Sequence, residues 1–178
     1  QTEQTQFSID NFDIYYDYSN ELIKILNNGI LKNKNYSVLA LGFGLGGLQL
    51  NLTKYDKIIK IDTVDYNYDL FRIFKKITSS YKVKVPEKIN YIYSDGVKYL
   101  EHCSKNGIKY DIIIDDMFNK YEKLKYDYNL LYHCLNDDGI LFMNVHKNVK
   151  DHVEKLEKDG YKSAEYIEKN EYLITAKK

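Results

Sequence analysis

The feature that most constrains this chain is an apolar strand that runs directly into a glycine-rich turn. Residues 38–41 (Val-Leu-Ala-Leu) precede Gly42-Phe43-Gly44-Leu45-Gly46-Gly47, and a short helical pattern of leucines begins at Leu48. Such a turn brings backbone N–H groups to a helix N-terminus, where they can hold the polar part of a nucleotide-like ligand. Asp65 follows about twenty residues later, at the end of the next apolar strand, where a carboxylate can bind ribose hydroxyls. Together these features predict a site for a ribose-containing cofactor.

The rest of the sequence alternates between apolar strands and amphipathic helices. We predict strands at 38–41, 58–64, 89–93, 110–114 and 140–145, helices at 12–30, 47–54, 69–78, 97–103, 123–134 and 149–159, and alternating runs at 162–167 and 171–176. The near-continuous apolar strands indicate a sheet that is covered on both faces. The pattern predicts a Rossmann-like, doubly wound α/β fold with a seven-stranded sheet, mostly parallel, that ends in an antiparallel hairpin. We expect residues 1–178 to form a single domain whose first ten residues are frayed.

Composition argues against several other classes of protein. Lys plus Arg and Asp plus Glu both number 26, so no net charge directs the chain to nucleic acid or to a membrane surface. No apolar run approaches the roughly 20 residues of a membrane span. Cys103 and Cys134 cannot make a disulfide framework and fit a reducing compartment, so we expect a cytoplasmic protein. The chain begins at Gln rather than Met, so we expect that a preceding segment was trimmed.

Two other kinds of site are disfavoured. The histidines lack the spacing of metal ligands, so we expect no metal site; they are His102, His133, His146 and His152. A nicotinamide dinucleotide site would match the Gly-x-Gly-x-x-Gly spacing of residues 42–47. However, the last two strands are typical of a hairpin rather than of another βαβ unit, and the aspartates after the third and fourth strands have no role in a dehydrogenase.

Polar or flexible residues follow each of the five predicted parallel strands. They are Gly42–Gly47, Asp65, Asp95-Gly96, Asp115-Asp116, and Asn144 with His146. In an open α/β sheet the ligand lies beyond these carboxyl ends of the strands. Each residue alone has a structural explanation, since Asp is a common turn residue and helix N-cap, as at Asp69 and Asp95. Three successive strands that deliver carboxylates opposite a glycine loop favour a ligand site instead.

Each carboxylate has a chemical role available at this edge. The two oxygens of Asp65 can accept hydrogen bonds from both hydroxyls of a ribose, and Asp95 can accept from the exocyclic amine of adenine. Asp115 would face the reacting end of the ligand, as an acceptor for an amine or as a general base. Asp116 ranks lower because alternation along the strand turns its side chain to the other face. His146 fits a base and an ordinary surface residue equally well.

The order of these motifs resembles the class I S-adenosylmethionine-dependent methyltransferase fold, in particular its spermidine-synthase-like branch. That branch reads Gly-Gly-Gly-Asp-Gly-Gly after the first strand, Glu-Ile-Asp after the second, Asp-Gly-x-x-(Phe/Tyr)-(Leu/Met) after the third and Asp-Ser-Ser-Asp after the fourth. The matching stretches here are residues 42–47, Asp65-Tyr66-Asn67, Asp95-Gly96-Val97-Lys98-Tyr99-Leu100, and 110–118 (Tyr-Asp-Ile-Ile-Ile-Asp-Asp-Met-Phe). The resemblance covers about residues 15–146, and the Asp-Gly and Tyr-Asp-Ile-Ile-Ile-Asp stretches are its most specific parts.

The resemblance implies that the cofactor is S-adenosylmethionine or its decarboxylated form. The glycine loop would hold the amino-acid part of the cofactor, Asp65 its ribose and Asp95 its adenine. Asp115 would lie beside the sulfonium as the catalytic residue. The cofactor-binding residues that the resemblance implies are Gly42, Gly44, Gly46, Asp65, Asp95, Gly96 and Asp115.

Two departures from the family pattern bear on the reaction. Leu45 stands where the polyamine enzymes carry Asp inside the glycine loop, and Phe118 stands where they carry the second Asp after strand four, which is associated with gripping the amine acceptor. A cationic diamine needs carboxylates for binding, so both losses argue against a polyamine acceptor. Leu45 also removes a charge that would repel the carboxylate of intact S-adenosylmethionine. We therefore expect a methyltransferase whose partners are this cofactor and an unknown acceptor.

Two alternatives remain open. An aminopropyltransferase of the spermidine- or spermine-synthase type would use decarboxylated S-adenosylmethionine and would need an acidic acceptor pocket. A non-catalytic descendant would keep the fold and serve as a binding module for a cofactor or a protein. The family's amino-terminal β-domain has no counterpart in this sequence, which favours the second alternative.

Overall fold

The computed structural model describes residues 17–31, 34–117, 128–145, 148–167 and 170–178. Within these ranges the seven expected strands form one sheet of order β3-β2-β1-β4-β5-β7-β6. The strands are β1 (Tyr36–Leu41), β2 (Ile58–Asp65), β3 (Ile89–Tyr93), β4 (Tyr110–Asp115), β5 (Leu135–Asn144), β6 (Ser163–Ile167) and β7 (Asn170–Lys177). Strands β1 to β5 are parallel, and β7 is antiparallel to both β5 and β6. The predicted fold class is therefore confirmed.

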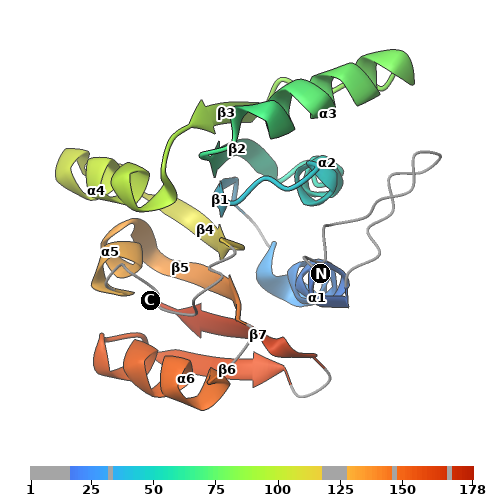
Figure 1. Cartoon of the computed structure of the whole chain (residues 1–178). Coiled ribbons are helices and arrows are strands. Elements are labelled where there is room, and N and C mark those ends of the chain that lie inside the picture. The colour runs from blue at the N-terminus through green and yellow to red at the C-terminus, as the bar shows by residue number, and fades with distance from the viewer. Residues whose placement is uncertain (1–16, 32–33, 118–127, 146–147, 168–169) are drawn as a thin grey trace.

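Helices cover both faces of the sheet (Figure 1). They are α1 (Asp17–Ile25) with the π-helical turn η1 (Leu26–Ile30), α2 (Gly47–Leu52), α3 (Tyr68–Ser80), α4 (Gly96–Asn106), α5 (Tyr128–His133) and α6 (Val149–Lys158). Helices α1, α2 and α3 pack on one face, where Ile112 and Ile114 of β4 join their core. Helices α4, α5 and α6 pack on the other face, which receives Ile113. Because both faces are buried, the strands are apolar along nearly their whole length.

Several predicted helix ends fall outside the described residues. The helix expected at 12–30 is described from Asp17 onward, and its last turn is widened, with Leu31 N–H donating to Leu26 O at 3.5 Å. The helix expected at 123–134 is described only as α5. The first ten residues, expected to be frayed, also lie outside the described ranges.

Strand β5 begins earlier than predicted because it contains a bulge. Tyr110 lies opposite Leu135, whereas Ile112 lies opposite Ile140, so residues 136–139 protrude from the ladder. Asp138 has a left-handed φ of +60°, as a tight turn requires. The residues predicted as a turn, 136–139, therefore lie within strand β5, at the irregularity in its pairing with β4.

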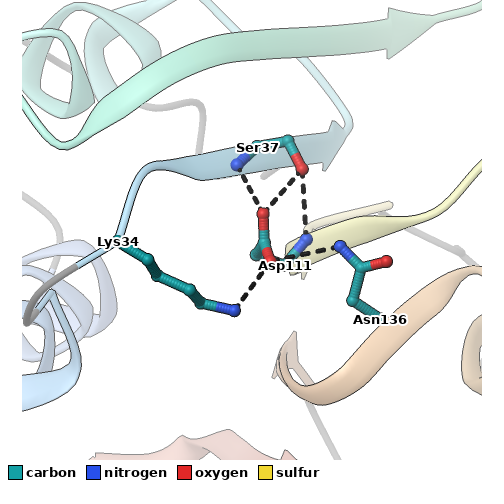
Figure 2. A network of polar contacts seen from close by, with 4 residues as sticks. All are labelled: Lys34, Ser37, Asp111 and Asn136. Carbon is teal, nitrogen blue, oxygen red and sulfur yellow. Dashed lines mark hydrogen bonds and ion pairs between the residues drawn. The ribbon is translucent and has the colours of Figure 1, made fainter.

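Asp111 joins the amino ends of three strands, as Figure 2 shows. Its Oδ2 accepts hydrogen bonds from the backbone N–H and the hydroxyl of Ser37 on β1, both at 2.9 Å. Its Oδ1 accepts from Asn136 in the β5 bulge at 3.1 Å and from Lys34 at 2.9 Å. Burial acts to raise the pKa of Asp111, but the hydrogen bonds from Ser37, Lys34 and Asn136 outweigh it and hold the pKa below its usual value. Asp111 thus fixes the register of β1, β4 and β5.

We expect Asp111→Asn to destabilise the fold by about 1–3 kcal/mol at neutral pH, because hydrogen bonds to a partly buried carboxylate are lost or weakened. The folded-state pKa is lowered, so this stabilisation is present above the unfolded pKa of about 4 and is lost as the pH falls through the folded value. Denaturant unfolding of the wild type and of Asp111→Asn should therefore show that the difference in their free energies of unfolding narrows as the pH falls from about 7 to about 3. Asp137→Asn, at an exposed residue of the same bulge, is the control and should change stability by less than about 0.5 kcal/mol. A difference in the free energy of unfolding that does not vary with pH would contradict the role given to the carboxylate.

Candidate functional site

Hydrogen bonds beyond the strand ends connect the carboxyl ends of β1 to β5 into one continuous edge. They run from Ser94 N to Asp65 O (3.1 Å), from Gly42 N to Val64 O (2.8 Å), from Asp116 N to Leu41 O (2.9 Å), and from Asn144 Nδ2 to Asp116 Oδ1 (2.8 Å). The strand order reverses between β1 and β4, which is where ligands bind in open α/β sheets. The structure therefore brings the predicted residues to one edge, in the order that the sheet topology requires.

The glycine loop approaches its neighbours too closely for side chains. Gly42 has φ +94°, and a Cβ there would lie 2.6 Å from the backbone oxygen of Asp116. Gly46 has φ +77°, and a Cβ there would lie 2.6 to 2.7 Å from ring atoms of Phe74 and Phe43. Gly44 also has a left-handed φ of +54°. Glycine is thus needed in this loop for both backbone conformation and space.

Asp65 is bonded directly to the glycine loop. Its Oδ2 accepts from Phe43 N–H at 2.9 Å, and its Oδ1 accepts from Asn67 N–H at 2.8 Å. The Phe43 ring is buried against Phe71 and Tyr91, with ring centroids at 4.8 and 5.6 Å. This packing holds the Phe43 amide against the carboxylate. Because a carboxylate has about four acceptor positions, each oxygen of Asp65 retains capacity for a further donor.

Asp95 and Gly96 form the start of α4. Asp95 is exposed and its Oδ1 accepts from Lys98 N–H at 3.1 Å, so its interpretation as a helix N-cap is confirmed. Its interpretation as an adenine acceptor stays a prediction. Gly96 is buried because Met117, from the end of β4, packs where a Cβ would lie. The Met117 side chain therefore fills the space between the start of α4 and the end of β4. The sequence pattern did not indicate this contact.

The two aspartates at the end of β4 face different environments, as predicted. Asp115 is only 3% exposed, and its Oδ1 accepts from Met117 N–H at 3.2 Å. Burial raises the pKa of Tyr128, the first residue of α5, and the negative charge of Asp115 adds to that effect. Asp116 is half-buried and accepts from Asn144 instead. Asp115 thus provides a buried carboxylate at the point where the strand order reverses.

Gln49 is a buried residue that hydrogen-bonds to the glycine loop, and the sequence analysis missed it. It is 1% exposed, and its Nε2 donates to Gly42 O at 3.3 Å and to the hydroxyl of Thr63 at 3.1 Å. Its Oε1 has no hydrogen-bond partner among the described residues. The available signal was a single polar residue between Leu48 and Leu50 in an otherwise apolar run.

Other features of the described residues do not add to this edge. His146 and Phe118, which were singled out above, lie outside the described ranges. A cavity of about 170 Å³ between Leu26 and Tyr55 lies near the amino ends of β1 and β2, at the opposite end of the strands from the candidate site. Across the described ranges, no cluster of His, Cys, Asp or Glu could hold a metal ion, and no helix is long and apolar enough to cross a membrane.

We expect Gly42→Ala to destabilise the protein more than Gly107→Ala. Both glycines have a left-handed φ, +94° and +65°, so both variants incur a backbone cost of about 1 kcal/mol. A Cβ at Gly107 meets nothing within 4 Å, whereas a Cβ at Gly42 collides with Asp116. Denaturant unfolding should therefore show an additional loss of at least about 1 kcal/mol for Gly42→Ala. Equal losses would show that the loop does not depend on this close approach.

Residues 19–176 match the family model of the spermine/spermidine synthase domain. A polyamine aminopropyltransferase from Clostridium botulinum (strain Alaska E43 / Type E3) is 32% identical over 171 residues, which cover 88% of this chain and 55% of that protein. The chain thus spans about half the length of the curated relatives it matches.

Solved structures share the fold at low sequence identity. Spermidine synthase from Thermotoga maritima gives a TM-score of 0.62 at 16% identity, over 83% of this chain and 55% of that one. Human methyltransferase-like protein 13, solved in complex with SAH, gives a TM-score of 0.68 at 17% identity, over 91% of this chain and 81% of that one. These similarities show a class I methyltransferase-like fold. Since the family model spans most of the chain, this protein belongs to the spermine/spermidine synthase domain family.

Proposed function

We propose that this chain carries the cofactor site of an aminopropyltransferase, which moves the aminopropyl group of decarboxylated S-adenosylmethionine to an amine. Its curated relatives bear that activity in their names, and its family is that of spermine and spermidine synthases. This support outweighs the methyltransferase interpretation, which depended on Leu45 and Phe118 alone. The whole reaction stays a proposal because the chain spans about half of those relatives.

The observation that carries the proposal is the bond between Asp65 and the glycine loop. Two backbone N–H groups hold the Asp65 carboxylate in place, and each oxygen can still accept one ribose hydroxyl. Asp95 and Gly96 would lie at the adenine, one strand further along the edge. The loop from Gly42 to Gly46 would then lie at the sulfonium side chain, next to the end of β4.

In the proposed reaction, the amine nitrogen forms a bond to the carbon that leaves the sulfonium sulfur. The C–S bond breaks, methylthioadenosine leaves, and the amine must lose a proton. The sulfonium supplies the driving force, so the chain has mainly to position the acceptor in line. We assign the proton to the carboxylate of Asp115, which is buried at the point where the strand order reverses.

Methyl transfer from intact S-adenosylmethionine is the second candidate, and Leu45 favours it. Leu45 lies half-buried in the glycine loop, where the family pattern has Asp. An apolar side chain there would not repel the carboxylate of the intact cofactor. The two candidates therefore differ in which form of the cofactor binds more tightly.

We expect Asp65→Asn to weaken the binding of methylthioadenosine by about one to two orders of magnitude, because a hydrogen bond to a charged group contributes about 1.5–3 kcal/mol. Isothermal titration calorimetry measures the affinity, and thermal unfolding checks that the variant is folded. Asp69→Asn is the matched control: Asp69 is exposed, pairs with Arg72 at 3.2 Å and should leave the affinity unchanged. Equal affinities for wild type and Asp65→Asn would contradict the ribose assignment.

Turnover assays then separate the reaction from the binding. Tighter binding of decarboxylated than of intact S-adenosylmethionine, with transfer to a diamine, supports aminopropyl transfer; the reverse preference supports methyl transfer. Binding without any turnover supports the non-catalytic alternative. If Asp115 is the base, Asp115→Asn should keep its affinity for methylthioadenosine and lose about 10²–10⁴-fold in turnover.

A further inference from the structure

The peptide group between Gly42 and Phe43 is held by side chains at both of its ends. Its N–H donates to Asp65 Oδ2 at 2.9 Å, and its carbonyl oxygen accepts from Gln49 Nε2 at 3.3 Å. Asp65 comes from the end of β2, whereas Gln49 comes from the first turn of α2. One peptide group of the glycine loop is therefore bonded to two other elements of the fold.

The orientation of this peptide group decides whether Asp65 keeps its bond to the loop. The chain on either side is anchored, because Gly42 N–H donates to Val64 O at 2.8 Å and the Phe43 ring is buried. A peptide group can still rotate about the line between its two Cα atoms, and Gly42, with a φ of +94° and no Cβ, resists such rotation little. Rotation would turn the N–H away from the Asp65 carboxylate and bring the carbonyl oxygen towards it. The bond from Gln49 to that oxygen opposes the rotation.

Gln49 is an unusual residue to bury at this place. It is 1% exposed, and its neighbours Leu48 and Leu50 pack in the core. The Nε2 atom donates a second hydrogen bond, to Thr63 Oγ1 at 3.1 Å, but Oε1 has no hydrogen-bond partner among the described residues. A buried amide oxygen without a partner lowers stability, and an apolar side chain of the same size would avoid that cost. The amide is therefore explained by what Nε2 holds rather than by the packing of α2.

We propose that Gln49 is a positioning residue for the cofactor: it fixes the Gly42–Phe43 peptide group, and through it the carboxylate of Asp65. Because Gln49 is buried, it would not touch the ligand itself. The inference rests on the proposed function, in which Asp65 accepts the ribose hydroxyls, and adds that the affinity for the nucleoside depends on a residue behind the loop. The ribose is remote from the bond that breaks, so loss of the Gln49 amide should raise KM for the cofactor and leave kcat nearly unchanged.

The first test needs no ligand and uses two backbone amides as reporters in NMR spectra. Phe43 N–H donates to one oxygen of Asp65 and Asn67 N–H to the other, at 2.9 and 2.8 Å. In the wild type, both amide proton shifts should follow the protonation of this carboxylate as the pH falls from about 7 to about 3. In Gln49→Met, which keeps the length of the side chain without its donor, the Phe43 shift should lose most of this response and the Asn67 shift should keep it. An unchanged response at Phe43, or a loss at both amides, would overturn the proposal.

The second test measures the affinity for methylthioadenosine by isothermal titration calorimetry. Gln49→Met should weaken binding by about three- to tenfold, the effect of one neutral hydrogen bond. In an Asp65→Asn background the same substitution should change the affinity by less than about twofold, because the carboxylate that Gln49 positions is no longer there. Equal weakening in both backgrounds would show that Gln49 acts independently of Asp65, and would overturn the proposal.

Thr78→Val is the matched control for both tests. Thr78 is 3% exposed on α3, which packs on the same face of the sheet as α2, and its hydroxyl donates to Phe74 O at 2.9 Å. This variant also removes a buried polar group, but it should leave the Phe43 amide response and the affinity unchanged; thermal unfolding checks that every variant is folded. If the wild type does not bind methylthioadenosine, the proposed function fails, whereas the amide responses still decide whether Gln49 holds the peptide group.

Discussion

The hydrogen bond from Phe43 N–H to Asp65 is the constraint on which the rest of the candidate site depends. It ties the loop after β1 to the end of β2, and the buried ring of Phe43 keeps the amide in place. On the other side, Gly42 lies against the backbone of Asp116, where no Cβ fits. The loop is therefore fixed by both neighbouring strands through the protein's own contacts. A preformed loop loses little conformational entropy when a ligand binds.

The two ends of β4 serve different purposes within six residues. Asp111 holds the amino ends of β1, β4 and β5 in register, and its carboxylate is fully engaged by protein donors. Asp115 lies at the carboxyl end of the strand, where the strand order reverses and a ligand can bind. The stretch from Tyr110 to Asp115, one of the two most specific parts of the family resemblance, thus combines a structural and a candidate catalytic carboxylate. The same residue type can have either role, and its position along the strand decides which.

The fold could be predicted from the sequence because buried parallel strands and their turns leave a local signal. The bulge in β5 could not, since it depends on the contact between Asn136 and Asp111 across the sheet. Gln49 and Met117 were missed for the same reason, because each contacts another element: Gln49 donates to Thr63 of β2, and Met117 packs against Gly96 of α4. The preference for methyl transfer gave two positions, Leu45 and Phe118, more weight than the whole motif order. The family membership, which rests on a match over residues 19–176, gives the motif order the greater weight.

The central claim is that the edge formed by β1, β2 and β3 binds the nucleoside part of a sulfonium cofactor. Amide chemical-shift mapping by NMR with methylthioadenosine tests it most directly. The predicted result is a set of saturable shifts at Phe43, Asn67 and Gly96 and their neighbours, with none at Ser37 or in the β5 bulge. Saturable shifts confined to the amino edge of the sheet, or no shifts at millimolar ligand, would contradict the assignment.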